Sequence, residues 1–157
     1  MQVHRSLNEL PTLFFEFHGS PESVTEDARI VQEIVSEFDG TEFVWTSDEG
    51  ERRKLWQARH NSHFAAAAAN PGKKGVSTDM AVPPSKLAEA VAMVDATLAK
   101  HPFPYTILGH VADGNFHSQL MTDISKPEDL VAIREFVHDM TMKVIEVGRT
   151  FPRRHGK

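Results

Sequence analysis

The sequence contains no cysteine among its 157 residues. Disulfides and thiolate metal sites are therefore excluded. No apolar run approaches the roughly 20 residues that a membrane helix needs, and the first ten residues lack the charged head and apolar stretch of a signal peptide. We therefore expect a cytoplasmic protein without a transmembrane segment, which meets a membrane surface only as part of a full-length enzyme.

The chain also lacks a basic stripe. Lys and Arg number 17 against 22 Asp and Glu, which gives a formal net charge of -5, and the cations are spread along the sequence. Phosphate binding needs clustered cations, so nucleic acid is not expected as a partner. The composition, 40% hydrophobic and 25% charged, indicates one globular domain that is large enough to bury a core. We place this domain at residues 1–148 and an atypical tail at residues 149–157.

Turn and capping residues divide the chain into alternating strands and helices. Strands are expected at Thr12–His18, Glu42–Thr46, Val76–Val82, Tyr105–Val111 and Phe116–Met121. Helices are expected to begin after Ser20, after Ser47 (running into the alanines at 65–69), at Ser85 and at Pro127. This order predicts an α+β fold of the ferredoxin-like kind, with a mixed or antiparallel sheet and helices packed on one face.

Two of the nine histidines flank a tight turn. Asp113-Gly114 between two strand-like runs predicts a type I′ hairpin, because both central residues of that turn need a positive φ. This register places His110 directly opposite His117 on one side of the sheet, with Cβ atoms roughly 4.5–5.5 Å apart. Two imidazoles at that distance can share a metal ion, although a catalytic metal normally has three protein ligands. The alternative is a cross-strand pair that only packs or bonds to the backbone.

The nine residues Gly109–His117 resemble the Gly-His-x-x-Asp-Gly-Asn-x-His signature of the FAD-linked oxidases of the D-lactate dehydrogenase and glycolate oxidase type. Two further stretches agree in order and spacing. Pro11–Gly19 resembles the first strand of that family's C-terminal domain, and Leu55–His60 with Ser77–Pro83 resembles its central helix and strand. The resemblance extends to Gly148 and so covers nearly the whole chain.

The resemblance implies a division of roles between two domains. An N-terminal FAD-binding domain of the family holds the flavin, and the C-terminal domain caps it and shapes the substrate pocket. In this chain His110 and His117 would ligate a divalent ion, zinc or manganese, that holds the oxygens of a small 2-hydroxy acid. Arg59 would pair with the substrate carboxylate through two parallel hydrogen bonds. His63, four residues further along the same expected helix, shares the face of Arg59 and is a second candidate substrate contact.

The chain departs from the family in two places. It has no Gly-rich strand-to-helix turn with the dinucleotide spacing, so we expect FAD to be held by another domain, which is absent from these residues. Near the C-terminus His155 keeps the position of the family's catalytic base, whereas Arg154 stands where a glutamate supplies the third metal ligand. A guanidinium has no lone pair to offer a metal, which weakens the expected metal binding.

These features predict the cap and substrate domain of an FAD-dependent D-2-hydroxy-acid dehydrogenase that oxidises D-lactate-like substrates to 2-oxo acids. The isolated chain is expected to be inactive, because the flavin carries the hydride chemistry. A cap without its flavin domain exposes the surface that it normally buries, so we also expect self-association. The alternative is a stand-alone α+β module that binds a small anion or a protein and has no redox role.

Overall fold

The structure is a computed structural model that describes residues 10–40 and 43–146. The chain divides into two compact units, and the boundary lies between Arg59 and His60. The first unit contains α1 (Pro21–Glu37) and α2 (Glu49–His60) up to its last residue. The second unit contains α3 (Ser62–Ala69), α4 (Leu87–Leu98), α5 (Pro127–Glu146) and all the strands.

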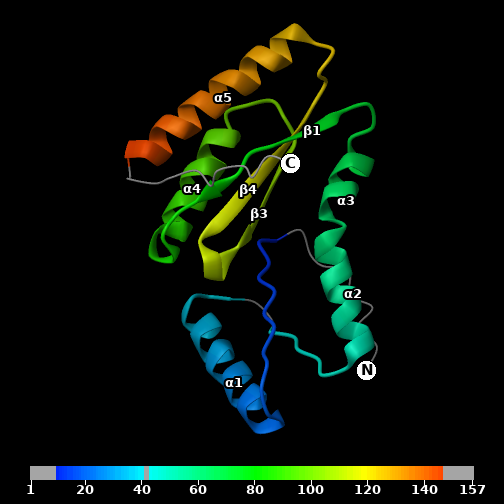
Figure 1. Cartoon of the computed structure of the whole chain (residues 1–157), viewed down its shortest axis with the longest axis vertical. Helices are drawn as coiled ribbons and strands as arrows, with labels where there is room; N and C mark the ends of the chain where they lie inside the picture. The colour runs from blue at the N-terminus through cyan, green and yellow to red at the C-terminus, as the bar shows by residue number, and fades with distance from the viewer. Residues whose placement is uncertain (1–9, 41–42, 147–157) are drawn as a thin grey trace, which may run out of the picture. The chain divides into compact units, whose positions relative to one another are not determined.

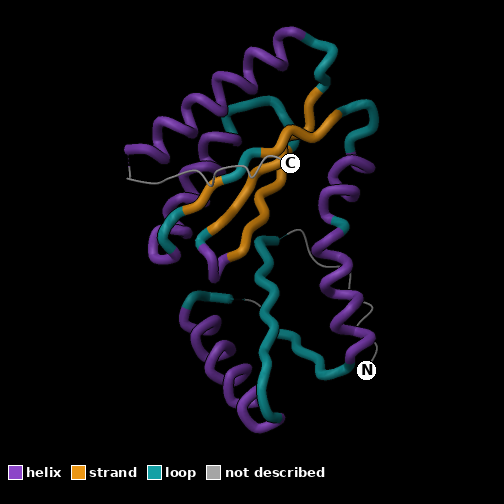
Figure 2. Tube along the Cα trace, viewed as in Figure 1, coloured by secondary structure: helices purple, strands orange, loops and turns teal. Residues whose placement is uncertain are grey.

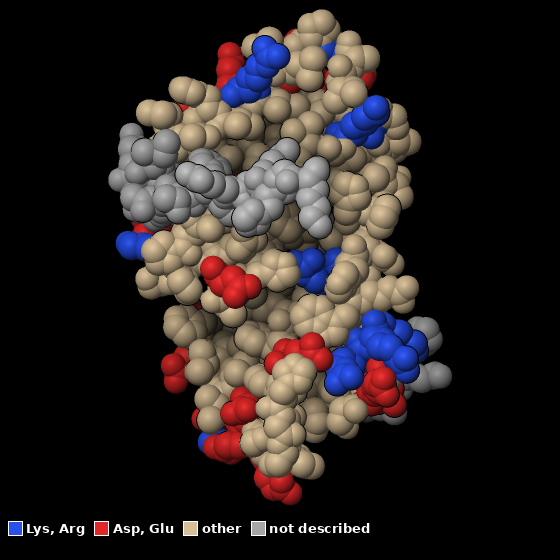
Figure 3. All heavy atoms as spheres, viewed as in Figure 1, with Lys and Arg blue, Asp and Glu red and all other residues tan. Residues whose placement is uncertain are grey.

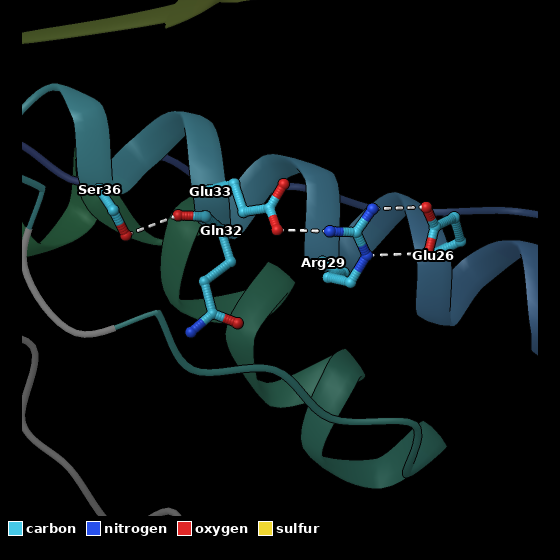
Figure 4. A network of polar contacts seen from close by, with 5 residues as sticks. All are labelled: Glu26, Arg29, Gln32, Glu33 and Ser36. Atoms are coloured by element: carbon cyan, nitrogen blue, oxygen red, sulfur yellow. Dashed lines mark hydrogen bonds and ion pairs between the residues drawn. The ribbon is translucent and has the colours of Figure 1, made fainter.

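Helix α1 begins at the capping residue predicted from the sequence. The Ser20 Oγ accepts a hydrogen bond at 3.2 Å from the backbone N–H three residues on, and Pro21 takes the first helical position, which needs no N–H donor. On the surface of this helix Arg29 bridges Glu26 and Glu33 (Figure 4). The pKa of Glu26 is lowered because the Arg29 guanidinium donates hydrogen bonds to its carboxylate. These ion pairs lie in solvent and so add little stability.

The first unit buries few of its apolar side chains. Among its described residues Ala28 is the one buried apolar residue. Its exposed large apolar side chains are those of Leu10, Leu13, Phe15, Ile30, Ile34, Phe38, Val44 and Trp45. Exposed apolar side chains in such number are typical of a surface that another apolar surface covers.

Two segments predicted as strands have no regular structure, so these predictions were wrong. Thr12–His18 and residues 43–46 are drawn as loops in Figure 2. Aromatic and β-branched residues favour an extended backbone, but a strand also needs a hydrogen-bonded neighbour. Neither segment pairs with a strand of the sheet. Local aromatic packing is found instead, with the ring of Phe14 centred 6.3 Å from that of Trp56.

The helix predicted to run through Arg59 into the alanines is interrupted. Asn61 separates α2 from α3, with backbone angles of φ -83° and ψ 0°. Asparagine is a weak helix former because its side chain competes for backbone hydrogen bonds. Arg59 and His63 therefore lie on different helices, and the argument that they share one helix face was wrong.

The second unit is built on one antiparallel sheet with β4 at its centre (Figure 1). Its strands are β1 (Lys74–Ser77), β2 (Met80–Ala81), β3 (Tyr105–His110) and β4 (Asn115–Thr122). β3 pairs along one edge of β4, and β1 and β2 pair along the other. The single strand predicted over Val76–Val82 is thus split, although both pieces keep one register against β4. The α+β class is confirmed, with every strand pair antiparallel.

Helices α4 and α5 cover one face of this sheet (Figure 1). The sheet, both helices and the loop before β3 form a common core of Met80, Val82, Leu87, Ala90, Val94, Leu98, Phe103, Phe116, Leu120, Ile133, Phe136 and Met140. Side chains alternate between the two faces of a strand, so the residues between these core positions lie on the opposite face. That opposite face carries both histidines of the hairpin.

A polar contact joins α4 to β3. The Tyr105 hydroxyl donates a hydrogen bond to Asp95 Oδ1 at 2.8 Å, and this bond, followed by partial burial and the nearby charge, raises the pKa of Tyr105. Because the folded state then binds the phenol proton more tightly, the contact stabilises the fold below about pH 10 and is lost as the pH rises through the folded pKa. We expect the free energy of unfolding of the wild type to fall more steeply above about pH 10 than that of Tyr105→Phe. Urea titrations over a pH series measure both slopes, and parallel slopes would contradict the assignment.

Candidate functional site

The hairpin of β3 and β4 carries both candidate metal ligands, in a register that differs from the prediction. His110 pairs with Asn115, and Leu108 pairs with His117, so the predicted direct opposition of the two histidines was wrong. The difference is two residues, and side chains alternate with a period of two. His110 and His117 therefore still share a face, as diagonal neighbours with Cα atoms roughly 7–8 Å apart. Long side chains can still meet across that diagonal.

The connection between the two strands explains the change of register. It is a 3₁₀ turn over Val111–Asp113 followed by Gly114, which has φ 66° and ψ 15°. A type I′ turn would need a positive φ at Asp113 as well, and a left-handed conformation is unfavourable for a residue with a Cβ. Gly114 is also held by Val82, whose N–H donates to the Gly114 carbonyl at 2.8 Å. The longer turn thus leaves the left-handed position to glycine.

Three cross-strand pairs, each with at least one polar residue, lie on the face of the sheet opposite α4 and α5. From the turn outward, the cross-strand pairs are His110 with Asn115, Leu108 with His117, and Thr106 with Gln119. His110 is exposed and His117 is half-buried. Imidazole groups of this kind can bind a metal or exchange hydrogen bonds with a carboxylate and a hydroxyl.

Asp79 lies on the same face, in the short gap between the end of β1 and the start of β2. Because β1 and β2 continue in one register against β4, Asp79 lies level with His117. Its Oδ1 accepts a hydrogen bond at 3.0 Å from Asn115 Nδ2. Asn115 thus links the hairpin to a segment that is distant in the sequence. No motif indicated Asp79, whose one sequence signal is a polar pair of residues inside a strand-like run.

The described residues do not complete a metal centre. Across residues 10–40 and 43–146, no three His, Asp or Glu side chains are grouped so that they could hold a metal ion. The imidazoles of His110 and His117 suit zinc or manganese as ligand types. Two ligands fall short of the three protein ligands of a usual catalytic site.

The remaining candidate residues lie elsewhere in the chain. Arg59 is half-buried in the first unit, near the end of α2. His63 is exposed on α3, with its ring edge-on to that of Phe64 at 5.5 Å and 86°. The roles predicted for both in substrate binding stay predictions. His155 and Arg154 lie outside the described residues.

Both signs of charge are visible on the face drawn in Figure 3, with Lys and Arg in blue and Asp and Glu in red. Local ion pairs such as Lys54 with Glu51, at 3.0 Å, contribute to this mixture. Within the described ranges no helix combines the length and the apolar character needed to span a bilayer.

Comparison with known proteins places the whole chain in one family. Residues 3–157 match the family described as FAD linked oxidases, C-terminal domain. The chain is 36% identical over 146 residues to a probable mitochondrial D-lactate dehydrogenase of Danio rerio, covering 93% of this chain and 29% of that protein. It is 32% identical over 152 residues to the mitochondrial D-lactate dehydrogenase (cytochrome) of Arabidopsis thaliana, covering 97% and 27%. It is 28% identical over 144 residues to glycolate oxidase subunit GlcD of Bacillus subtilis strain 168, covering 92% and 30%.

The chain spans 27% to 30% of the length of these relatives. Two of them are named as mitochondrial, so the cytoplasmic location expected from the sequence stays a prediction. The family match includes the nine-residue hairpin signature and the two other stretches that carried the resemblance, which confirms it. The chain therefore belongs to the FAD linked oxidases and corresponds to their C-terminal domain.

Proposed function

We propose that this chain is the substrate-binding domain of an FAD-dependent dehydrogenase that oxidises a D-lactate-like 2-hydroxy acid to the 2-oxo acid. One observation carries the proposal: His110 and His117 share the sheet face that lies opposite the core. The relatives named D-lactate dehydrogenase support the substrate class. The relative named glycolate oxidase subunit supports the wider class of 2-hydroxy acids.

Three residues of this face, His110, Asn115 and His117, take part in binding the acid. The imidazoles of His110 and His117 orient the carboxylate and the hydroxyl of the substrate, by hydrogen bonds in the metal-free chain and through a divalent ion where one is bound. Asn115 is held by Asp79 at 3.0 Å, which keeps the hairpin in place beneath the ligand. Apart from this face, the family resemblance assigns to Arg59, on α2 of the first unit, a charge-assisted pair of hydrogen bonds to the carboxylate.

The flavin belongs to another domain in this proposal. FAD, when bound there, supplies the acceptor for the hydride, and this chain supplies the surface that closes over it. His155 takes the hydroxyl proton, as its position in the family signature suggests, and His63 is a second contact to the substrate. Without the flavin domain the chain has no electron acceptor and is inactive. The many exposed apolar side chains support the prediction that the isolated chain associates with itself.

The two histidines also form part of a metal site in this proposal, and the third ligand comes from outside the described residues. We expect the metal-free chain to bind one zinc ion weakly, and His110→Ala and His117→Ala to lose at least about tenfold in affinity, because each removes one of two ligands. Calorimetric titration with zinc measures this loss. His138→Ala, at an exposed position on α5, is the matched control and should bind as the wild type does. Equal zinc affinity in the wild type and all three variants would contradict the metal proposal.

A further inference from the structure

We propose that Thr106 sets the substrate preference of this domain by hydrogen bonding a polar group on C3 of the 2-hydroxy acid. The inference rests on the proposed function and narrows its substrate class. Acids that carry a 3-hydroxyl group, such as glycerate, would be preferred over lactate, which carries a plain methyl group there.

The position of Thr106 on the sheet supports this role. It lies on β3 on the same face as His110, and it is two residues from Leu108, which pairs with His117. Thr106 is therefore a diagonal neighbour of His117, with Cα atoms roughly 7–8 Å apart. A small acid held at His117 by its carboxylate and 2-hydroxyl extends from there along the strand. Its C2–C3 bond then passes the apolar side chain of Leu108, and its C3 substituent reaches Thr106.

The hydroxyl group of Thr106 has no partner. Its Oγ1 is the one buried side-chain oxygen or nitrogen of the described residues that makes no hydrogen bond, whereas the large majority of such atoms in proteins are bonded. An unsatisfied buried hydroxyl is unfavourable. Thr106 as a whole is only half-buried, and rotation about χ1 exchanges its hydroxyl and methyl groups. The hydroxyl can thus turn toward a ligand that offers it a bond.

The residue opposite Thr106 does not satisfy this hydroxyl. Gln119 is 2% exposed, and its Nε2 donates to the sulfur of Met121 at 3.5 Å, which is a weak acceptor. The amide lies over Gly75, where a Cβ would come within 2.6 Å of Nε2. Gly75 thus makes room for Gln119 to turn toward Met121. The hydrogen-bonding capacity of Thr106 is left for a ligand.

Binding of D-glycerate and D-lactate to the full 157-residue chain tests the inference. Calorimetry would be run on the wild type, on Thr106→Val, which removes the hydroxyl but keeps the shape, and on Thr106→Ser, which keeps the hydroxyl. Thr141→Val is the matched control, since its hydroxyl donates to the Val137 carbonyl at 2.6 Å within α5. Thermal unfolding of each variant confirms that it is folded.

We expect the wild type and Thr106→Ser to bind D-glycerate more tightly than D-lactate, by about fivefold, as one neutral hydrogen bond allows. Thr106→Val should lose this preference without loss of affinity for D-lactate, and Thr141→Val should keep it. A preference that persists in Thr106→Val, or no preference in the wild type, overturns the inference and leaves the proposed function intact. A wild type that binds neither acid overturns both.

Discussion

Replacing Gly114 by alanine is expected to lower the free energy of unfolding by about 2–4 kcal/mol. At φ 66° the backbone of the new alanine would have to adopt the left-handed conformation, which is unfavourable for a residue with a Cβ. That Cβ would also collide with the carbonyl oxygen of Val82. That oxygen belongs to the backbone and cannot rotate away, so the turn between β3 and β4 must move. Urea unfolding followed by circular dichroism measures the loss of stability, and zinc titration of the variant reports whether His110 and His117 still act together.

Gly72→Ala is the matched control for this change. Gly72 also has a positive φ, 82°, but a Cβ there would meet nothing within 4 Å. Its substitution should therefore lower the free energy of unfolding only by the cost of holding alanine in the left-handed conformation, roughly 1 kcal/mol. Zinc binding should be unchanged. Equal losses in the two variants would show that the contact with Val82 is not what requires glycine in the hairpin.

Replacing Phe136 by alanine is expected to lower the free energy of unfolding by about 3–5 kcal/mol. Phe136 is 0% exposed in the core between α5 and the sheet, and its ring meets that of His101 edge-on at 5.6 Å. Alanine would leave a cavity with few atoms free to fill it. A small domain has roughly 5–15 kcal/mol of stability in total, so the variant should unfold at a much lower urea concentration.

Phe64→Ala is the matched control for Phe136→Ala, because it removes an aromatic ring that is not buried. Phe64 is 69% exposed on α3, and its truncation should change the free energy of unfolding by less than about 0.5 kcal/mol. If both variants lost stability to the same extent, the core defined around Phe136 would be misassigned.

Features of the helices that depend on nearby residues were predictable from the sequence. Helices α1 and α5 begin at Pro21 and Pro127, as the turn and capping residues around those positions predicted. Such signals lie within one turn of the helix that they start, so they act before any distant partner is present.

Features that depend on distant residues were not predictable in this way. The turn type of the hairpin is decided partly by Val82, which closes over Gly114. Two aromatic-rich segments have strand-like composition, but composition does not say whether a partner strand is available. The break of the long helix at Asn61 was a third such case, because the alanines that follow favour a continuous helix.

The candidate site was predicted in part for a physical reason. Alternation along strands keeps His110 and His117 on one face for any register shift of two residues, so their common face did not depend on the turn type. The bond between Asn115 and Asp79 joins residues that are 36 positions apart. No local pattern encodes such a contact, and Thr106 was missed because its environment is visible only in the folded sheet.

The central place of β4 has a consequence for the order in which this sheet assembles. Its pairing with β3 closes only a short loop, whereas its pairing with β1 must close a loop that contains all of α4. Closing a longer loop costs more chain entropy, and contacts between distant residues form slowly. We therefore expect the hairpin to form before the rest of the sheet and to bring the two histidines onto one face in a fast, local event. Asp79 is expected to join them only when β1 and β2 pair with β4, so the histidine pair forms before its carboxylate neighbour is in place.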